Sequence, residues 1–438
     1  MNETVIQFGE GNFLRGFFNW FLDVMNEKGL YDGKAVVIQP RAGGKCQLLN
    51  SQDCKYNLYL RGLENGEIKN EHRLINSISR GIDPYKDFDA FMSLAENPDM
   101  RFVVSNTTEA GIAFDESCKF TDTPCLSFPG KLTQLLFRRF EKGLKGFVFL
   151  PCELIDNNGD ELKKCILRYA ELWGLSEEFV FWVNEENVFL NTLVDRIVTG
   201  YPSDDTAQLH PDDKFLDTAE IFHLWVIEGD FEDELPLKKA GFNVIWTDDV
   251  KPYKKIKVRI LNGAHTCLVA LSLLSGINSV GEAMDDDLLY SYLDRCMKTE
   301  ILSVIGETEE SCAFAKSVYD RFRNPFIYHK WRSIALNSVS KYSVRVLPTI
   351  LEYKEKNGVF PKYLPLSLAA LIYFYKNDTP EDAPEVVEFI ENGKISEILG
   401  NTALWQADIS SLGDIVTEYY EKLDKLGAKE TVKWILSE

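Results

Sequence analysis

The sequence predicts an α/β protein whose N-terminal half is a doubly wound parallel sheet and whose C-terminal half is mostly α-helical. In the first half, short apolar runs alternate with helix-like stretches, which is the pattern of parallel strands joined by crossover helices. Beyond Thr247 the pattern changes to long amphipathic segments, which indicate helices. A chain of 438 residues is too long for one ordinary core, so we expect two domains, residues 1–250 and residues 251–438.

The expected elements follow in chain order. In the first half they are a strand at Thr4–Phe8, a helix at Phe13–Glu27, strands at Lys34–Gln39, Arg101–Ser105 and Gly146–Leu150, a helix at Asp160–Trp173 and a strand at Phe242–Thr247. In the second half they are helical segments at Val258–Leu274, Asp286–Ile305, Ser311–Arg323, Ser333–Lys356 and Leu364–Lys376, with helical periodicity again from Val386.

Composition and charge narrow the classes of function. The net charge of -20 disfavours nucleic acid and anionic membranes, because phosphate binding needs a basic face. No apolar run reaches the ~18 residues that cross a bilayer, and the start lacks the basic region of a signal peptide. We therefore expect a cytoplasmic protein with neither nucleic-acid nor membrane partners, while the oligomeric state is not indicated.

Cysteine and histidine spacing argues against a metal site. The nine cysteines include no Cys-x-x-Cys pair, and the five histidines include no His-x3-His pair. We expect reduced, mostly buried thiols and no metal.

A glycine turn follows the first expected strand. Gly9 and Gly11 would let the backbone approach a pyrophosphate, and Asn12 and Phe13 open the following helix. Leu14 stands where the third glycine of the Gly-x-Gly-x-x-Gly pattern falls. The pattern therefore indicates either a dinucleotide-binding turn or a structural turn.

Polar residues follow three further expected strands. Arg41 stands after the second strand, where an acid usually holds the ribose of NAD, and it would either accept a 2′-phosphate or lie in solvent. Asn106, Thr108 and Glu109 follow the third strand, and Asn157 follows the fourth. Because parallel strands present their carboxyl ends to a ligand, we predict that these residues line one cleft, with Glu109 toward the substrate. The alternative is ordinary turn and N-cap chemistry.

The segment after the domain boundary carries Lys257, Asn262 and His265 in the spacing Lys-x4-Asn-x2-His. On a regular α-helix these residues lie at roughly 0°, 140° and 80°, so they share one side. Asn262-Gly263 is a poor helix pair to find in mid-helix. The alternative is that the basic residues form an exposed helix start and that the histidine makes its hydrogen bonds within the core.

Alcohol oxidation would suit these three residues. A lysine surrounded by Lys254, Lys255 and Arg259 is expected to have a lowered pKa and to exchange the hydroxyl proton while hydride passes between the substrate and a nicotinamide. Asn262 would donate a hydrogen bond to the developing alkoxide, and His265 would orient the substrate.

Lys257-x4-Asn262-x2-His265 resembles the active-site motif of the polyol-specific long-chain dehydrogenases, the mannitol dehydrogenase family. The run from Asn191 to Ile197 resembles that family's Val-Asp-Arg signature, and the similarity extends from Val5 to about Phe374. The resemblance implies a Rossmann-type N-terminal domain, a helical substrate-binding domain, NAD as cofactor, no metal, and lysine as general acid and base. The runs 8–15, 105–111, 151–156 and 193–200 are most similar to members that act on sugar acids, which implies a small-molecule sugar-acid substrate.

The resemblance also assigns roles to further residues. It implies that Asn191 and Asn262 form the oxyanion site, although the residues alone allow Asn191 to be a helix N-cap. Lys341 aligns with a basic position that lines the polyol site of the family. With Arg345 or His329 nearby, Lys341 is the candidate partner of the substrate carboxylate, and a solvated surface role is the alternative.

Overall fold

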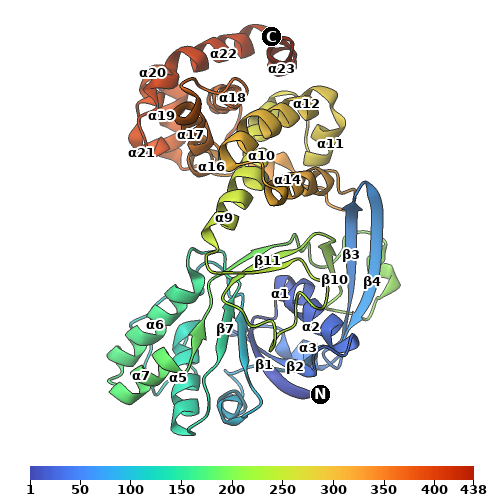
Figure 1. Cartoon of the computed structure of the whole chain (residues 1–438), viewed down its shortest axis with the longest axis vertical. Coiled ribbons are helices and arrows are strands. Elements are labelled where there is room, and N and C mark those ends of the chain that lie inside the picture. Colours follow the sequence, from blue (N-terminus) through green and yellow to red (C-terminus); the bar gives the residue numbers. More distant parts are fainter. The chain divides into compact units, whose positions relative to one another are not determined.

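The computed structural model describes all residues from 1 to 438 and divides into two compact units (Figure 1). The first unit comprises Met1–Arg61 and Lys69–Val250, and the second comprises Gly62–Ile68 and Lys251–Glu438.

The short piece that the first half contributes to the second unit is the tip of a β-hairpin. Its Asn65 donates its backbone N–H to Asp320 Oδ2 at 3.0 Å, and its side-chain oxygen accepts a hydrogen bond from Lys316 Nζ at 3.2 Å. Nothing in the local sequence marks this hairpin tip as part of the helical unit.

A six-stranded parallel sheet lies at the centre of the first unit, with the order β5-β2-β1-β6-β7-β8. This confirms the predicted doubly wound sheet. The strand order reverses between β1 and β6, so a ligand is expected beyond the carboxyl ends Phe8 and Ser105. The strands are β1 Asn2–Phe8, β2 Gly33–Ile38, β5 Ile78–Ile82, β6 Phe102–Ser105, β7 Val148–Pro151 and β8 Val188–Phe189.

Both faces of this sheet are buried, which explains its continuous apolar strands. Val5 and Ile6, adjacent in β1, point into different hydrophobic cores because successive side chains of a strand alternate between faces. The helices that accompany the sheet are α1 Asn12–Gly16, α2 Phe18–Glu27, α3 Cys46–Asn50, α4 Phe88–Ser93, α5 Phe128–Glu141, α6 Asn158–Leu172 and α7 Glu177–Glu185, with a short 3-10 turn at Leu94–Glu96.

Two three-stranded sheets complete the first unit. One has the order β10-β3-β4 and the other the order β12-β11-β9. Their strands are β3 Tyr56–Glu64, β4 Glu67–Ile75, β9 Thr192–Asp195, β10 Asp217–Glu220, β11 Leu224–Glu228 and β12 Val244–Thr247, and α8 spans Thr206–Leu209.

The second unit is helical apart from the hairpin tip, which confirms the predicted mostly helical C-terminal half. Its helices are α9 Lys251–Lys257, the π-helix Val258–Asn262, α10 Gly263–Leu274, α11 Val280–Asp285, α12 Asp287–Arg295, the π-helix Cys296–Ile301, α13 Leu302–Ile305, α14 Glu309–Phe322, α15 Trp331–Ile334, α16 Ser338–Arg345, α17 Leu347–Asn357, α18 Leu364–Asn377, α19 Pro384–Asn392, α20 Ile395–Leu399, α21 Thr402–Trp405, the 3-10 turn Ser410–Leu412, α22 Gly413–Leu426 and α23 Ala428–Ser437.

Three expected long helices are interrupted. The helix expected at 13–27 breaks at Phe17, the segment 286–305 contains a π-helix, and 333–356 is divided among α15, α16 and α17. The last division has a local cause, because Pro348 stands in the first turn of α17, where a proline is tolerated but cannot continue a preceding helix.

One continuous helical stretch, Lys251–Leu274, is long and apolar enough to span a membrane by length and composition. However, 61% of its most apolar window is buried within the protein, as in the core helix of a globular unit.

Candidate functional site

A cavity of about 550 Å³ lies at the carboxyl edge of the parallel sheet, where the strand order reverses. Seven of the eight predicted cofactor residues line it, and the eighth, Asn157, does not. Glu109, which was predicted to lie toward the substrate, is not in the lining either. The lining residues are Gly9, Glu10, Gly11, Asn12, Phe13, Arg15, Pro40, Arg41, Ala42, Gly43, Gly44, Lys45, Asn106, Thr107 and Thr108.

The two glycines of the turn are required for different reasons. Gly9 has φ +119°, and a Cβ there would lie 2.8 Å from the backbone oxygen of Asn106, so the fold itself requires glycine. At Gly11 a Cβ would meet nothing within 4 Å. Contacts within the protein therefore do not explain why residue 11 is glycine. A ligand that lies close to the backbone of the turn would explain it, so this cavity fits a dinucleotide.

Gly16 supplies the close packing that the missing third glycine would give. A Cβ at Gly16 would lie 2.9 Å from the side chain of Val198, the residue that directly follows the Val-Asp-Arg signature run. The Gly16 carbonyl also accepts a hydrogen bond from Arg196 Nη1 at 2.9 Å. The signature run therefore packs directly against α1, the helix that follows the glycine turn.

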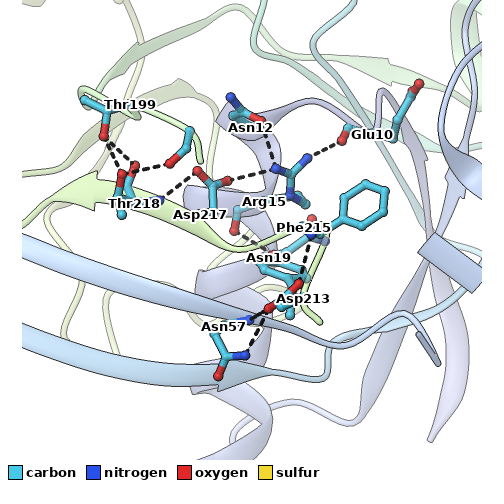
Figure 2. Close-up of polar contacts among 12 residues, drawn as sticks. Glu10, Asn12, Arg15, Asn19, Asn57, Thr199, Asp213, Phe215, Asp217 and Thr218 are labelled. Atoms are coloured by element: carbon cyan, nitrogen blue, oxygen red, sulfur yellow. Dashed lines mark hydrogen bonds and ion pairs between the residues drawn. The ribbon is translucent and has the colours of Figure 1, made fainter. Parts of the chain in front are cut away.

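The Arg15 side chain donates hydrogen bonds to two residues of the glycine turn (Figure 2). Its Nη1 donates to the Glu10 carbonyl at 2.6 Å, and its Nη2 donates to Asn12 Oδ1 at 2.8 Å. Its guanidinium stacks over the Phe215 ring at 5.0 Å, and Tyr56 donates its hydroxyl hydrogen to the Arg15 carbonyl at 2.8 Å.

Asp217 of β10 is the counter-charge of Arg15, with its Oδ2 3.4 Å from Arg15 Nη2 (Figure 2). The Asp217 side chain is fully buried, and this burial raises its pKa to about 7, although the Arg15 charge opposes the shift. Neither Arg15 nor Asp217 was predicted as a site residue from the sequence. The only sequence signal for Arg15 was its place in the run 8–15 that resembles the family.

The loop after β2 contains basic residues where an acid is usual. Arg41 and Lys45 are exposed and line the cavity, and the only acid in the lining is Glu10, whose Oε1 accepts the Lys45 backbone N–H at 3.2 Å. Gln39 is buried and donates to the Arg41 carbonyl at 2.8 Å, so it fixes the loop.

The ends of β6 and β7 are tied together by a buried carboxylate. Glu153 accepts hydrogen bonds from Ser105 Oγ and from both the backbone N and the Oγ1 of Thr107, each at 2.9 Å. Burial raises the pKa of Glu153, and these hydrogen bonds oppose the rise. Beside them, Asn106 donates to the Cys152 carbonyl at 3.0 Å, which orients its side chain at the cavity wall.

Asn157, predicted to bind the cofactor, is an exposed residue with φ +50° at the N-terminus of α6. The buried residue there is Asn158, which donates to the carbonyl oxygens of Pro151, Glu153 and Thr192. The structure therefore supports the turn interpretation of this strand end.

Asn191 lies between β8 and β9, so it is not the first residue of its own helix. Its Oδ1 accepts the backbone N–H groups of Gly159 and Asp160 at 3.0 and 3.1 Å, and therefore caps α6 from outside. Its Nδ2 donates to Asp160 Oδ2 at 3.0 Å and to Glu228 Oε2 at 2.8 Å.

Lys257, Asn262 and His265 lie in one helical stretch, but the assumption of a regular α-helix is wrong. Residues Val258–Asn262 form a π-helix between α9 and α10. A π-turn holds one extra residue, so it rotates the following residues back by about 100°. The separation of Lys257 and His265 about the axis falls from roughly 80° to roughly 20°.

His265 lies among aromatic and basic side chains of α14, α15 and the loop between them. Its ring centroid is 4.2 Å from that of Phe322, 5.2 Å from His329 and 6.3 Å from Trp331. Burial holds the pKa of His265 well below its usual value, and the charges of His329, Arg321 and Arg345 lower it further. The charged groups that act most strongly on this ring are therefore all basic.

Two of the basic residues near Lys257 are already paired. Lys255 Nζ lies 2.8 Å from Glu352 Oε2, and Arg259 Nη2 lies 3.0 Å from Glu352 Oε1. Both cations therefore share the Glu352 carboxylate of α17, whose single negative charge offsets one of their two positive charges.

Lys341 and Arg345 lie one turn apart on α16 and have different surroundings. Lys341 donates to the Ile334 carbonyl at 3.0 Å, and burial lowers its pKa, with a further lowering by Arg345 and an opposing effect of Asp382. The half-buried guanidinium of Arg345 makes no hydrogen bond and no ion pair, and burial lowers its pKa. Of the two, only Arg345 is available to an anion without giving up a contact.

No group of three or more His, Cys, Asp or Glu side chains is arranged to hold a metal ion. All nine cysteines are free thiols, and only Cys312 is exposed.

Two family models match the chain. The mannitol dehydrogenase Rossmann domain matches residues 3–239, and the mannitol dehydrogenase C-terminal domain matches residues 249–427. The chain belongs to the mannitol dehydrogenase family. Like that family it is an oxidoreductase with a Rossmann-type domain, as the resemblance of the motifs implied.

Within the mannitol dehydrogenase family, the chain is similar to curated altronate oxidoreductases over nearly its whole length. The chain is 43% identical to the altronate oxidoreductase of Bacillus subtilis (strain 168), over 98% of this chain and 95% of the relative. It is 43% identical to that of Phocaeicola vulgatus, over 99% and 97%, and 44% identical to that of Yersinia enterocolitica, over 97% and 94%.

Two solved structures share the fold of this chain. D-sorbitol dehydrogenase in substrate-free form superposes with a TM-score of 0.87 at 22% identity, covering 99% of this chain and 95% of that chain. Pseudomonas fluorescens mannitol 2-dehydrogenase, a ternary complex with NAD and D-mannitol, gives 0.72 at 24% identity, covering 100% and 95%.

Proposed function

We propose that this chain is an NAD-dependent altronate oxidoreductase that interconverts D-tagaturonate and D-altronate. The observation that carries the proposal is its 42–44% identity, over nearly its whole length, to many curated altronate oxidoreductases. The basic surroundings of His265, in a chain of net charge -20, suit an anionic sugar acid better than a neutral polyol.

The reaction is a reversible hydride transfer. When bound, NADH would supply the hydride for the keto carbon of D-tagaturonate, and one proton would be taken up at the oxygen to give D-altronate. The cavity at the glycine turn would hold this dinucleotide, with Gly11 allowing close approach and Arg15 fixing the turn.

Lys257 donates the proton to the carbonyl oxygen and takes it back in the oxidation direction. Asn262 donates an amide hydrogen bond to the same oxygen as negative charge develops on it. The family resemblance assigns this role to Asn191 as well, whose two amide hydrogens are donated to Asp160 and Glu228 in this structure, so one of these bonds would have to break. His265, which its depressed pKa keeps neutral near pH 7, orients a substrate hydroxyl.

The small-molecule sugar acid is the partner of this site, and NAD is the cofactor. Because its substrate and product would be soluble intermediates of sugar-acid breakdown, we propose a cytoplasmic enzyme. We propose neither a nucleic-acid nor a membrane partner, because the strong net negative charge repels nucleic acids and anionic membranes.

Steady-state reduction rates for D-tagaturonate, D-fructuronate and fructose, each with NADH and with NADPH, test the proposal. We expect the highest kcat/KM with D-tagaturonate and NADH. A preference for D-fructuronate would make the chain a mannonate oxidoreductase, and a preference for fructose would make it a mannitol 2-dehydrogenase. Absence of turnover with all three would leave a non-catalytic NAD-binding protein.

A further inference from the structure

Arg345 is the half-buried arginine of the second unit whose charge has no partner. Its guanidinium makes no hydrogen bond or ion pair, and burial alone accounts for its lowered pKa. Arg259, also half-buried in this unit, is paired with Glu352 at 3.0 Å and donates to Thr349 at 3.0 Å. Removing a cation from water without a counter-charge is costly, so an unpaired arginine in such a place indicates an anionic ligand.

The position of Arg345 links it to the reacting end of the substrate site. It ends α16, and its backbone oxygen lies within 3.4 Å of where a Cβ on Gly263 would be, next to Asn262 in the Lys-x4-Asn-x2-His motif. Its charge acts on the ring of His265 and on Lys341. Arg345 therefore lies beside the motif residues rather than on a remote surface.

Lys341, one turn earlier on α16, fits an anion less well. Its ammonium donates to the Ile334 carbonyl at 3.0 Å and feels the charge of Asp382. Asp382 itself accepts the Tyr375 hydroxyl at 2.6 Å, so it is fixed in place near Lys341. An arriving carboxylate would have to displace the lysine contact and approach a carboxylate, whereas Arg345 requires neither.

The neighbouring histidines complete the site. His329 makes no side-chain hydrogen bond, and its ring meets that of His265 at 5.2 Å. Phe322, 4.2 Å from His265, supplies an apolar wall that strengthens a charge-assisted bond by excluding water. A planar guanidinium can bind both oxygens of a carboxylate at once, which an ammonium cannot.

We propose that Arg345 binds the carboxylate of the substrate and thereby selects sugar acids over neutral ketoses. This inference rests on the proposed function, because it assigns the specificity of the same site. Arg345 is a binding residue, and the proton transfer assigned to Lys257 does not pass through it.

The test compares Arg345→Met, Arg345→Lys and Lys341→Met in the full-length enzyme with NADH. We expect Arg345→Met to lower kcat/KM for D-tagaturonate about 100-fold, mainly through KM, while leaving the rate with fructose unchanged or higher. Arg345→Lys should restore only part of the loss, and Lys341→Met should cost less than Arg345→Met. The matched control is Arg332→Met, which removes an exposed arginine of α15 that pairs with Asp378.

A second readout separates binding from folding. D-altronate should raise the Tm of the wild-type protein and of Arg332→Met but not that of Arg345→Met. Without ligand, the Tm of Arg345→Met should equal or exceed that of wild type, because an unpaired, half-buried charge has been removed. Equal losses of kcat/KM for D-tagaturonate and fructose, or a larger loss in Lys341→Met, would overturn the assignment to Arg345. A wild-type preference for fructose would instead overturn the proposed function, whatever Arg345 does.

Discussion

Arg15 and Asp217 form an ion pair beneath the glycine turn, with 3.4 Å between Nη2 and Oδ2 and side chains that are 6% and 0% exposed. One comes from α1 and the other from β10, about 200 residues later. Arg15 joins Asp217 to the Glu10 carbonyl and the Asn12 side chain, so the shape of the turn depends on a residue of a different sheet.

Replacement of Arg15 by lysine should weaken NADH binding. An ammonium cannot reach Glu10, Asn12 and Asp217 together, so the turn loses part of its support. We expect the Kd for NADH, measured by fluorescence titration, to rise roughly tenfold, which corresponds to about 1.4 kcal/mol. Arg138→Lys, at an exposed arginine that pairs with Glu96, is the control. An unchanged Kd in Arg15→Lys would show that the guanidinium does not shape the turn.

Alanine at the two glycines of the turn should separate folding from cofactor binding. Gly9→Ala should lower the free energy of unfolding by several kcal/mol, because its φ of +119° and the nearby Asn106 oxygen both oppose a Cβ. Gly11→Ala should leave stability unchanged and weaken NADH binding, because its Cβ would enter open space at the cavity. Urea unfolding and NADH titration of both variants measure the two effects. Normal NADH affinity in Gly11→Ala would argue against the dinucleotide at this turn.

Asp217 should make stability depend on pH. Its pKa is about 7 in the folded protein and about 3.9 when unfolded, so its contribution is fully present below pH 4 and is lost as the pH rises through 7. Asp217→Asn lacks this titration. We therefore expect the Tm of Asp217→Asn, relative to wild type, to be higher at pH 8 than at pH 5. The relative stability should change by about 1.4 kcal/mol per pH unit from pH 5 to about pH 7 and should be constant above that.

Thermal unfolding from pH 5 to pH 8 checks this prediction for Asp217. Asp233→Asn, at an acid whose side chain is 99% exposed, provides the control and should track wild type at every pH. The same Tm difference between Asp217→Asn and wild type at both pH values would mean that Asp217 is ionised throughout.

Asn191 should matter for stability whatever its part in catalysis. Its side-chain oxygen caps α6 through two backbone N–H groups, and loss of such a cap costs about 1 kcal/mol. Asn191→Ala should therefore unfold at lower urea concentration. If the amide also binds the reacting oxygen, kcat should fall in conditions where the variant is fully folded, and a purely structural residue would leave kcat unchanged there.

Much of the fold and part of the site could be predicted from the sequence. Apolar strand periodicity is a local signal, so the parallel sheet and the glycine turn at Gly9 were predictable. The partnership of Arg15 with Asp217 was not, because it joins distant segments and neither residue has a local pattern. The same holds for Glu352, whose pairing with Lys255 and Arg259 changes the charge near the motif.

The π-helix at Val258–Asn262 shows a different limit. Asn262-Gly263 marked the segment as unusual, but helical periodicity assumes a constant rotation for each residue and cannot reveal one extra residue in a turn. The segment was therefore correctly predicted to be helical, but with the wrong angular relation between Lys257 and His265.

The proton-transfer role of Lys257 is the central claim, and Lys257→Met tests it most directly. Its NADH Kd should equal that of wild type, because the cavity at the glycine turn is unaltered, while kcat for D-tagaturonate should fall by a factor of about 10² to 10⁴. Lys298→Met, at an exposed lysine that pairs with Asp294, should keep wild-type turnover. A kcat for Lys257→Met within threefold of wild type, with NADH binding intact, would contradict the account.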